Sequence, residues 1–370
     1  MKAVKWTEDD VRFMREAHDL AKSAEGRTTP DPMVGSVLVK GGRIISMGYH
    51  GEVTTPHAEA WAIQKAGEEA AGCTLYVNLE PCCFFARKNN PPCTEAIIKA
   101  RIKRVVVSMK DPNPGVNGKG LAKLKRHGIK VDVGLLEEEA RKLNEVFIKW
   151  ITTHRPFVAL KSAVTLDGKI ATRTGASRWV AGPEALRYAH HLRNIYDAII
   201  VGVNNVLVDD PRLNVRLVKK VKDPIRIVLD AYARTPLKAK VVNSRGGRTI
   251  IVVSQRAPAN RVALLAAKGA EILTLPAPRG MIDIRSLLKE LSKRRMTSLL
   301  VEGGGEVNAS FLEGKLVDKA AFIIAPKFFG GREAKTAVEG KGVAKPAQAV
   351  WLKSVHLERL GEDILVTGYL

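Results

Sequence analysis

The 370-residue sequence contains no apolar run of 18 residues, no run of five or six like charges, and no repeated or low-complexity segment. The first absence argues against a membrane-spanning helix, and the second argues against a basic tail for nucleic acid. The polar N-terminus shows no secretion signal, so we expect a cytoplasmic location. Hydrophobic residues make up 45% and charged residues 26%, which is typical of a globular protein and not of a disordered one.

Cysteine is scarce, and all of it lies in one short stretch. The four cysteines are Cys73, Cys82, Cys83 and Cys93. A chain of this length, for which two domains are expected, does not need disulfides to stabilise its cores. Clustered cysteines without a secretion signal instead indicate a metal site in a reducing compartment.

Positive charge is in excess: 60 Lys and Arg face 38 Asp and Glu, which gives a net charge of +22. Such an excess suits nucleic acid, an anionic membrane surface or small phosphorylated ligands. An ordinary solvated basic surface explains it equally well. The basic residues are scattered, with short clusters such as Lys123, Lys125 and Arg126. Charge alone therefore leaves these alternatives open.

The first half alternates helical and extended patterns. Thr7 and the acidic residues after it predict a capped helix that carries Val11, Met14, Ala17 and Ala21 on one face. Glycines at 41–42 predict a hairpin between strands 34–39 and 43–47, and Gly67 ends a helix over 57–65. Further strands are expected at 74–79, 105–108 and 129–133, joined by helices and parallel after the opening hairpin.

A charged helix over 137–150 is followed by Pro156, so we place the domain boundary near 148–156 and divide the chain into 1–150 and 151–370. The alternation then restarts, which predicts a second α/β domain. Its expected strands are 157–162, 198–202, 225–230, 249–254, 271–275, 298–302, 319–325 and 364–368. Its expected helices include 183–193, 258–268 and 284–294.

Three residues of the first half have the types that bind zinc. His57 and Glu59 open one predicted helix, Pro81 and Cys82 open a second, and Cys93 follows. One imidazole and two thiolates fill three of zinc's four tetrahedral positions and leave one for water. Zinc lowers the pKa of that water towards ~7, and Glu59 is placed to shuttle protons without ligating the metal. The pattern is the signature of zinc nucleobase deaminases.

Plainer explanations exist for each of these residues. A single histidine is usually structural, and free cysteines are commonly buried as small apolar side chains. Cys83 competes with Cys82 as a ligand, although the preceding Pro81 favours Cys82. Cys73 is expected to be only a buried side chain. The combination in order, with Glu59 in place, favours zinc.

The second half contains a strand that runs into a glycine-rich turn and then a helix, over 298–306. Backbone N–H groups at such a helix start bind phosphate, and glycine lets the ligand approach closely. The turn is not GxGxxG, so the standard dinucleotide fingerprint is absent. The segments 161–168 and 206–213 read by themselves as turns.

These motifs together resemble the bifunctional deaminase/reductases of riboflavin biosynthesis, over nearly the whole chain. The matching segments of the first half are Asp31-Pro-Met-Val-Gly35, Pro56-His57-Ala58-Glu59, Leu79-Glu80-Pro81-Cys82, Pro91-Pro92-Cys93 and Asp111-Pro-Asn-Pro114. Those of the second half are 161–169, 177–179, 202–216, 224–230 and 301–305. Few other families join a zinc deaminase to a reductase in this order.

The resemblance implies a cytidine-deaminase-like three-layer first domain and a dihydrofolate-reductase-like second domain. It implies hydrolytic deamination of diaminohydroxyphosphoribosylaminopyrimidine, then NADPH reduction of the ribosyl group of 5-amino-6-(5-phosphoribosylamino)uracil to ribityl. One zinc ion per chain would be bound by His57, Cys82 and Cys93, with Glu59 as the catalytic proton shuttle. The partner would be a small phosphorylated pyrimidine, not a nucleic acid or a membrane, and the chain would be a candidate homo-oligomer.

The resemblance also implies which residues serve the reductase. The NADP-contacting positions are Ala163, Trp179, Asn205, Asp209, Gly304, Gly305, Glu306, Val307, Asn308, Ala309 and Ser310. The substrate positions are Ser177, Arg193, Leu213, Arg216 and Glu302. Of these, Arg193 and Arg216 have the bidentate chemistry that suits a substrate phosphate.

The chain departs from the family pattern at three places. Asp31 stands where asparagine is usual, Asn205 stands where threonine is usual, and the loop over 83–90 lacks the usual histidine and glycine.

Two alternative functions stay open. One is a zinc deaminase that acts on a base in RNA, with the net charge of +22 as its electrostatic footprint, and the other is a working reductase beside a degenerate deaminase domain.

Overall fold

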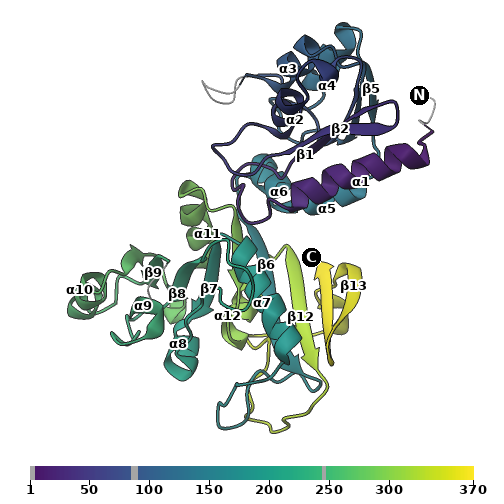
Figure 1. Ribbon diagram of the computed structural model, residues 1–370. Coiled ribbons are helices and arrows are strands. Elements are labelled where there is room, and N and C mark those ends of the chain that lie inside the picture. The colour runs from purple at the N-terminus through teal and green to yellow at the C-terminus, as the bar shows by residue number, and fades with distance from the viewer. Residues whose placement is uncertain (1–4, 85–90, 244–246) are drawn as a thin grey trace. The chain divides into compact units, whose positions relative to one another are not determined.

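The computed structural model describes residues 5–84, 91–243 and 247–370. The chain divides into two compact units, Met1–His154 and Arg155–Leu370, and each is described by itself (Figure 1). Both are mixed α/β structures built on one sheet, as the alternating sequence pattern predicts. None of the described helices is long and apolar enough to cross a bilayer.

The first unit is built on a five-stranded sheet in the order β2-β1-β3-β4-β5. The hairpin β1–β2 and the pair β1–β3 are antiparallel, whereas β3–β4 and β4–β5 are parallel. Its strands are β1 (Gly35–Lys40), β2 (Arg43–Tyr49), β3 (Thr74–Leu79), β4 (Arg104–Met109) and β5 (Lys130–Val133). Its helices are α1 (Glu8–Lys22), α2 (Ala58–Ala66), η1 (Gly67–Ala70), α3 (Cys93–Lys99), α4 (Lys119–Arg126), α5 (Glu137–Leu143) and α6 (Glu145–Thr153).

Helices cover both faces of this sheet, so its strands alternate between two apolar cores. Val37 and Tyr76 face α1, where they pack with Met14. Leu38 and Leu75, their neighbours in sequence, face the opposite core with residues of α2, α3 and α4. The unit therefore has three layers, and α2 and α3 lie on the same side of the sheet.

Gly48 allows α2 to lie directly against strand β2. A Cβ at Gly48 would lie 2.3 Å from the carbonyl oxygen of Ala58 and 2.7 Å from the backbone nitrogen of Ala62. A side chain at this position would therefore push the helix away from the strand. The close approach fixes where α2 begins, and the residues at its beginning are His57, Ala58 and Glu59.

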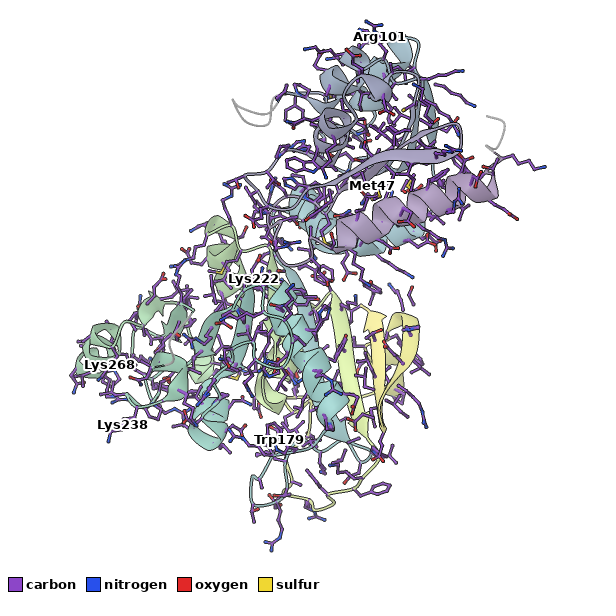
Figure 2. The ribbon with its side chains drawn as sticks, in the orientation of Figure 1. Met47, Arg101, Trp179, Lys222, Lys238 and Lys268 are labelled. Atoms are coloured by element: carbon purple, nitrogen blue, oxygen red, sulfur yellow. The ribbon has the colours of Figure 1, made fainter. Side chains whose placement is uncertain are left out.

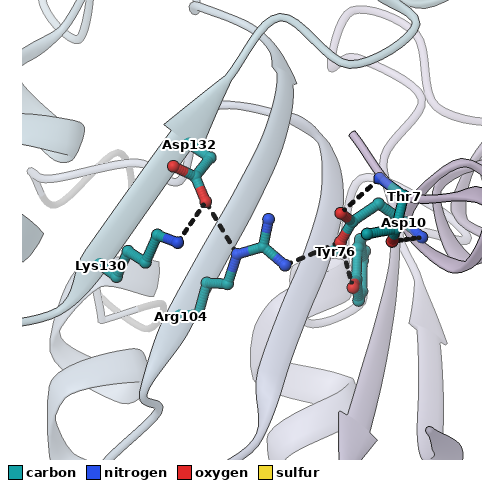
Figure 3. Close-up of polar contacts among 6 residues, drawn as sticks. All are labelled: Thr7, Asp10, Tyr76, Arg104, Lys130 and Asp132. Carbon is teal, nitrogen blue, oxygen red and sulfur yellow. Dashed lines mark hydrogen bonds and ion pairs between the residues drawn. The ribbon is translucent and has the colours of Figure 1, made fainter. Parts of the chain in front are cut away.

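A buried polar network fastens the first turn of α1 to the sheet (Figure 3). Asp10 Oδ1 accepts hydrogen bonds from Arg104 Nη1 and from the Tyr76 hydroxyl, each at 2.7 Å. Arg104 Nε also donates to Asp132 on β5 at 2.8 Å. Burial opposes ionisation of Asp10, but the hydrogen bonds from Arg104 and Tyr76 outweigh it and lower the pKa of Asp10 to about 2. The carboxylate stays charged and joins α1 to strands β3 and β4.

The second unit is built on a nine-stranded sheet in the order β10-β9-β8-β7-β11-β6-β12-β14-β13. The strands from β10 to β12 are parallel, and β14 and β13 add an antiparallel edge. They are β6 (Phe157–Thr165), β7 (Ala198–Gly202), β8 (Ile225–Leu229), β9 (Thr249–Val253), β10 (Glu271–Thr274), β11 (Ser298–Val301), β12 (Lys319–Ala325), β13 (Lys353–Leu360) and β14 (Asp363–Tyr369).

Helices cover both faces of this sheet as well. Leu287 of α11 and Phe311 of α12 pack on one face with Ile200, whereas Leu265 of α10 packs on the other with Ile251. The helices are α7 (Pro183–Ile195), α8 (Val203–Asp209), α9 (Lys240–Asn243), α10 (Ala259–Ala267), α11 (Ile284–Lys293) and α12 (Gly305–Glu313), with short turns η2 (Pro278–Gly280) and η3 (Pro346–Gln348). Because β7, β8 and β11 are parallel neighbours, their carboxyl ends meet at one edge.

The structure corrects two predicted elements of the first unit. The expected helix over 137–150 is two helices, because buried Asn144 leaves the helical conformation and its side-chain oxygen accepts from Met33 N at 2.8 Å. No helix begins at Pro81: the helix begins at Cys93, whose backbone N–H donates to Cys82 Sγ at 3.3 Å. In the second unit, the sequence patterns missed α8, α9 and the edge strand β13.

Candidate active sites

Three candidate ligands of the first unit lie together where α2 and α3 begin. His57 is the residue before α2, Cys93 opens α3, and Cys82 lies in the segment after β3. His57 Nδ1 is 3.2 Å from Cys93 Sγ and 3.5 Å from Cys82 Sγ. All three ligand atoms lie within 4.8 Å of one another.

The trio has the dimensions of a tetrahedral zinc site. Bond lengths of about 2.3 Å to sulfur and about 2.1 Å to nitrogen place tetrahedral N and S ligands about 3.6 Å apart. The observed N···S separations of 3.2 and 3.5 Å are close to this value. The donor set of one imidazole and two thiolates is also one that zinc prefers. His57, Cys82 and Cys93 therefore fit a zinc ion.

The charges of these groups also suit a metal. Hydrogen bonds with Cys93 and His57 lower the pKa of Cys82 to about 4 against the effect of burial, so Cys82 favours the thiolate that metals bind. Glu59 is almost fully buried, at 3% exposed, two residues after His57. Burial raises the pKa of Glu59, which suits a group that must both hold and release a proton.

Asp31 is the departure from the family pattern that lies beside this site. Its carboxylate oxygen Oδ2 lies 3.5 Å from Nε2 of the buried side chain of His50. The His50 ring in turn lies edge-on to His57, with ring centroids 5.5 Å apart. The altered loop over 83–90 lies outside the described residues from position 85 onward.

In the second unit, the glycine turn after β11 lies against α8. Asn205 Oδ1 accepts a hydrogen bond from Gly304 N at 3.1 Å, which joins two predicted cofactor positions that are far apart in sequence. A Cβ on Gly303 would lie 2.5 Å from Val307 Cβ, so glycine is needed for the chain to turn tightly into α12. The backbone N–H groups of the first turn of α12 have no partners within the helix and are available to an anion.

A buried acceptor at this turn points to a bound group. Asn308 Oδ1 is buried without a hydrogen-bond partner among the described residues, while Asn308 Nδ2 donates to Ala337 O at 2.8 Å. Oδ1 lies 3.3 Å from the place that a Cβ would occupy on Gly303. Buried polar atoms are nearly always paired, so a ligand that brings a donor to this turn fits the residues present.

A buried charged cluster lies beside the turn, between the middle of β6 and the end of β11. Arg193 of α7 donates to both carboxylate oxygens of Glu302, at 3.0 and 2.7 Å. Lys161 Nζ of β6 lies 3.7 Å from Glu302 Oε2. Burial would raise the pKa of Glu302, but Arg193 and Lys161 outweigh it and lower the pKa to about 2. Two cations thus share one carboxylate.

His190 extends this cluster as a neutral side chain. Burial, together with the charges of Arg193 and Arg216, lowers the pKa of His190 to about 4. Its Nδ1 accepts a hydrogen bond from Arg216 N at 3.1 Å, and Arg216 Nη1 donates to Asn214 Oδ1. Neither Lys161 nor His190 has a role predicted from the sequence. The one available indication was the polar end of the 161–168 segment.

The other predicted reductase positions are distributed over the same unit. Ser177 Oγ donates to Asp209 Oδ1 at 2.5 Å, which brings a substrate position and a cofactor position together. Trp179 is 60% exposed on the surface of the unit (Figure 2), whereas Leu213 is buried. Ala163 lies on β6, and the remaining predicted positions Glu306, Val307, Ala309 and Ser310 lie in the first half of α12.

The first unit places three zinc-type ligands beside a buried glutamate, and the second contains a glycine-rich turn of the kind that binds phosphate. Together these features define a zinc deaminase joined to a reductase. The family description "Cytidine and deoxycytidylate deaminase zinc-binding region" matches residues 7–109. The description "RibD C-terminal domain" matches residues 156–366. The chain belongs to the RibD family of riboflavin biosynthesis proteins, which confirms the resemblance and the expected two-domain fold class.

Full-length relatives support this assignment. The chain is 44% identical to the riboflavin biosynthesis protein RibD of Aquifex aeolicus (strain VF5), over 97% of this chain and 98% of that protein. It is 36% identical to RibD of Escherichia coli (strain K12), over 96% and 98%.

Two solved structures agree over the whole length. Acinetobacter baumannii RibD, form 2, has a TM-score of 0.85 at 35% identity and covers 98% of this chain and 99% of that one. A diaminohydroxyphosphoribosylaminopyrimidine deaminase/5-amino-6-(5-phosphoribosylamino)uracil reductase from Thermotoga maritima has a TM-score of 0.86 at 38% identity, with 98% of each chain covered.

Proposed function

We propose that this chain catalyses two consecutive steps of riboflavin synthesis. The first is hydrolytic deamination of diaminohydroxyphosphoribosylaminopyrimidine, and the second is NADPH reduction of the ribosyl group of 5-amino-6-(5-phosphoribosylamino)uracil to ribityl. The observation that carries the proposal is the zinc-sized trio of His57, Cys82 and Cys93 with buried Glu59 beside it. Residues 1–150 carry the deaminase and 151–370 carry the reductase, a division supported by the two compact units.

In the deaminase, three residues hold the metal and one moves the proton. His57, Cys82 and Cys93 bind zinc, which when bound lowers the pKa of water so that water attacks at neutral pH. The Glu59 carboxylate takes a proton from the attacking water and delivers it to the amino group that leaves as ammonia. Burial raises the pKa of Glu59, which favours its holding the proton between the two transfers.

In the reductase, the chain orients its ligands at the carboxyl edge of the sheet. Bound NADPH supplies a hydride, and the backbone N–H groups of the glycine turn and of the start of α12 bind its phosphates. Asn205 holds the glycine turn in place, and Asp209 contacts the cofactor away from its phosphates. Lys161 Nζ, held 3.7 Å from Glu302 Oε2, donates a hydrogen bond to a sugar oxygen of the substrate. Arg193 keeps Glu302 ionised, and Arg216 is the more available partner for the substrate phosphate because Arg193 is engaged by Glu302.

The substrate of both steps is a small phosphorylated pyrimidine, and nucleic acid and membranes are not partners. The proposed location is the cytoplasm, and the chain remains a candidate homo-oligomer. The net charge of +22 then serves phosphate ligands in part and is otherwise surface charge.

One experiment separates the proposal from its alternatives. The full chain, loaded with zinc, is given synthetic diaminopyrimidine nucleotide with and without NADPH, and each product is identified. We expect ammonia and the deaminated nucleotide without NADPH, and the ribitylamino product with it. Reduction of the deaminated nucleotide without any ammonia release would establish a degenerate deaminase, and deamination of transfer RNA alone would establish an RNA enzyme.

A further inference from the structure

Arg234 is an exposed arginine in the loop that follows β8, and it forms no ion pair within the described parts of the chain. Some other cations of this unit do have carboxylate partners: Arg248 pairs with Glu271 at 2.8 Å, and Lys240 pairs with Asp210 at 3.0 Å. The structure therefore leaves the charge of Arg234 available to an external anion.

The backbone around Arg234 is nevertheless held firmly. Buried Asp230 accepts hydrogen bonds from Arg234 N at 2.9 Å and from Thr235 N at 2.7 Å. Arg261 of α10 donates to the carbonyl oxygens of Ala233 and Thr235, at 3.2 and 2.7 Å. Side chains from two different elements thus fix the peptide groups on both sides of Arg234. An exposed side chain on so constrained a loop is pre-organised for binding.

The side chain of Arg234 reaches towards the candidate cofactor turn. Arg234 Nη2 donates to Asn204 Oδ1 at 3.1 Å, and the next residue, Asn205, accepts from Gly304 N at 3.1 Å. These contacts connect the ends of β8, β7 and β11, which are adjacent parallel strands. Arg234 therefore lies on the same edge as the glycine turn, two strands away from it.

This placement matches the shape of a dinucleotide. A dinucleotide bound across the carboxyl edge of a parallel sheet lays its two halves over neighbouring strand ends, with the pyrophosphate at a helix start. A guanidinium carries five N–H donors in a planar fork that suits phosphate, and Asn204 engages only one of them. We infer that Arg234 binds the 2′-phosphate on the adenosine ribose of NADPH and so selects NADPH over NADH. This inference rests on the proposed reductase function.

The test uses nucleotide fragments and needs no turnover. Adenosine 2′,5′-bisphosphate and 5′-AMP differ only by the 2′-phosphate, and the affinity of the full chain for each is measured by calorimetry. In Arg234→Gln we expect affinity for the bisphosphate to fall roughly ten- to a hundredfold, while affinity for 5′-AMP stays within about twofold. Arg234→Lys restores part of the loss because it keeps the charge but not the fork.

Arg248→Gln is the matched control, because it removes the same charge directly before the start of β9, at the amino ends of the parallel strands, and should change neither affinity. The ratio of kcat/KM for NADPH over NADH should fall in Arg234→Gln by the same factor as the bisphosphate affinity. An equal loss for both nucleotides, or no loss for either, would overturn the inference. If the wild type itself fails to reduce the deaminated nucleotide, the proposed function fails, whatever Arg234 does.

Discussion

The two candidate sites are encoded in different ways. The zinc trio of the first unit comes from a short part of the chain, with Cys93 36 residues after His57. The charged cluster of the second unit joins Arg193 to Glu302 across 109 residues of sequence. Cysteine is rare here, with four in the chain, whereas Lys and Arg number 60. A site made of rare residue types can be recognised from the sequence, but one made of common charges exists only once the fold has brought them together.

Glu59→Gln should separate the two sites most completely. Glutamine cannot carry the proton, so ammonia release should fall by about 10²–10⁴-fold. Reduction of nucleotide supplied already deaminated should be unchanged, as followed by NADPH absorbance. Ammonia release above a tenth of the wild-type rate, or a parallel loss of reduction, would contradict the separation.

Cys93→Ser should reduce zinc content from about one per chain to below a tenth, since two remaining ligands hold zinc weakly. Metal is measured by elemental analysis after dialysis against a chelator. Cys83→Ser is the matched control: it lies next to Cys82, outside the trio, and should keep its zinc. Zinc retained in the first variant, or lost in the second, would refute the ligand assignment.

Glu302→Gln tests the second site through stability. It leaves Arg193 and Lys161 buried without their carboxylate, and breaking a buried pair in this way costs about 3–5 kcal/mol of unfolding free energy. Urea unfolding of the full chain measures this loss, and exposed Glu333→Gln is the control. The triple variant Lys161→Met/Arg193→Met/Glu302→Met should regain most of the stability, because no charge of the cluster is left buried without a partner. A triple variant as unstable as the single one would contradict this explanation.

The units should also differ in their response to pH. Burial, with Glu80 and Cys82 nearby, raises the pKa of Asp111 from 3.8 to about 7, whereas Glu302 remains ionised down to about 2. Between pH 4 and 7 the unfolded chain ionises Asp111 while the folded chain keeps its proton. This group therefore lowers stability as the pH rises through that window.

Asp111→Asn removes this penalty and keeps the oxygen that accepts from Asn113 N at 2.8 Å. The variant should match the wild type near pH 4 and exceed it by about 1–3 kcal/mol near pH 8, in urea unfolding at both pH values. Exposed Asp9→Asn should show no such pH-dependent gain. A gain of equal size at both pH values would show that Asp111 is ionised in the folded chain.

Local chemistry made most of the elements predictable. Thr7 caps α1 as expected, because its side chain accepts from Asp10 N, and Gly41 and Gly42 turn the hairpin with positive φ. Strand β13 could not be predicted from the sequence, because all of it but Leu360 is exposed. Without a buried face, its residues need not alternate between apolar and polar. The break at Asn144 was equally hidden, since its cause is a contact with Met33, 111 residues away.

The same limit applies to the sites. His57, Cys82 and Cys93 were grouped by residue type and do lie together, although the expected helix start at Pro81 was wrong. Arg193 was predicted as a partner for phosphate from the resemblance and from its bidentate chemistry. In the structure, two of its three guanidinium nitrogens donate to Glu302, and nothing in the sequence shows this contact. Lys161 and His190 had no distinguishing neighbours in the sequence, and only the folded chain reveals them, through the contacts of Lys161 with Glu302 and of His190 with Arg216.

The contact between Asn144 and Met33 bears on how the first unit can be transplanted. The deaminase zinc-binding description ends at residue 109, yet the amide of Asn144 holds the peptide of Met33, directly after the Asp31 segment beside His50. A graft that ends at residue 109 leaves the Met33 N–H without its acceptor, at a cost of about 1–3 kcal/mol. The shortest segment that can be transferred to another protein with this contact intact therefore extends through Asn144, well beyond the residues that carry its recognisable motifs.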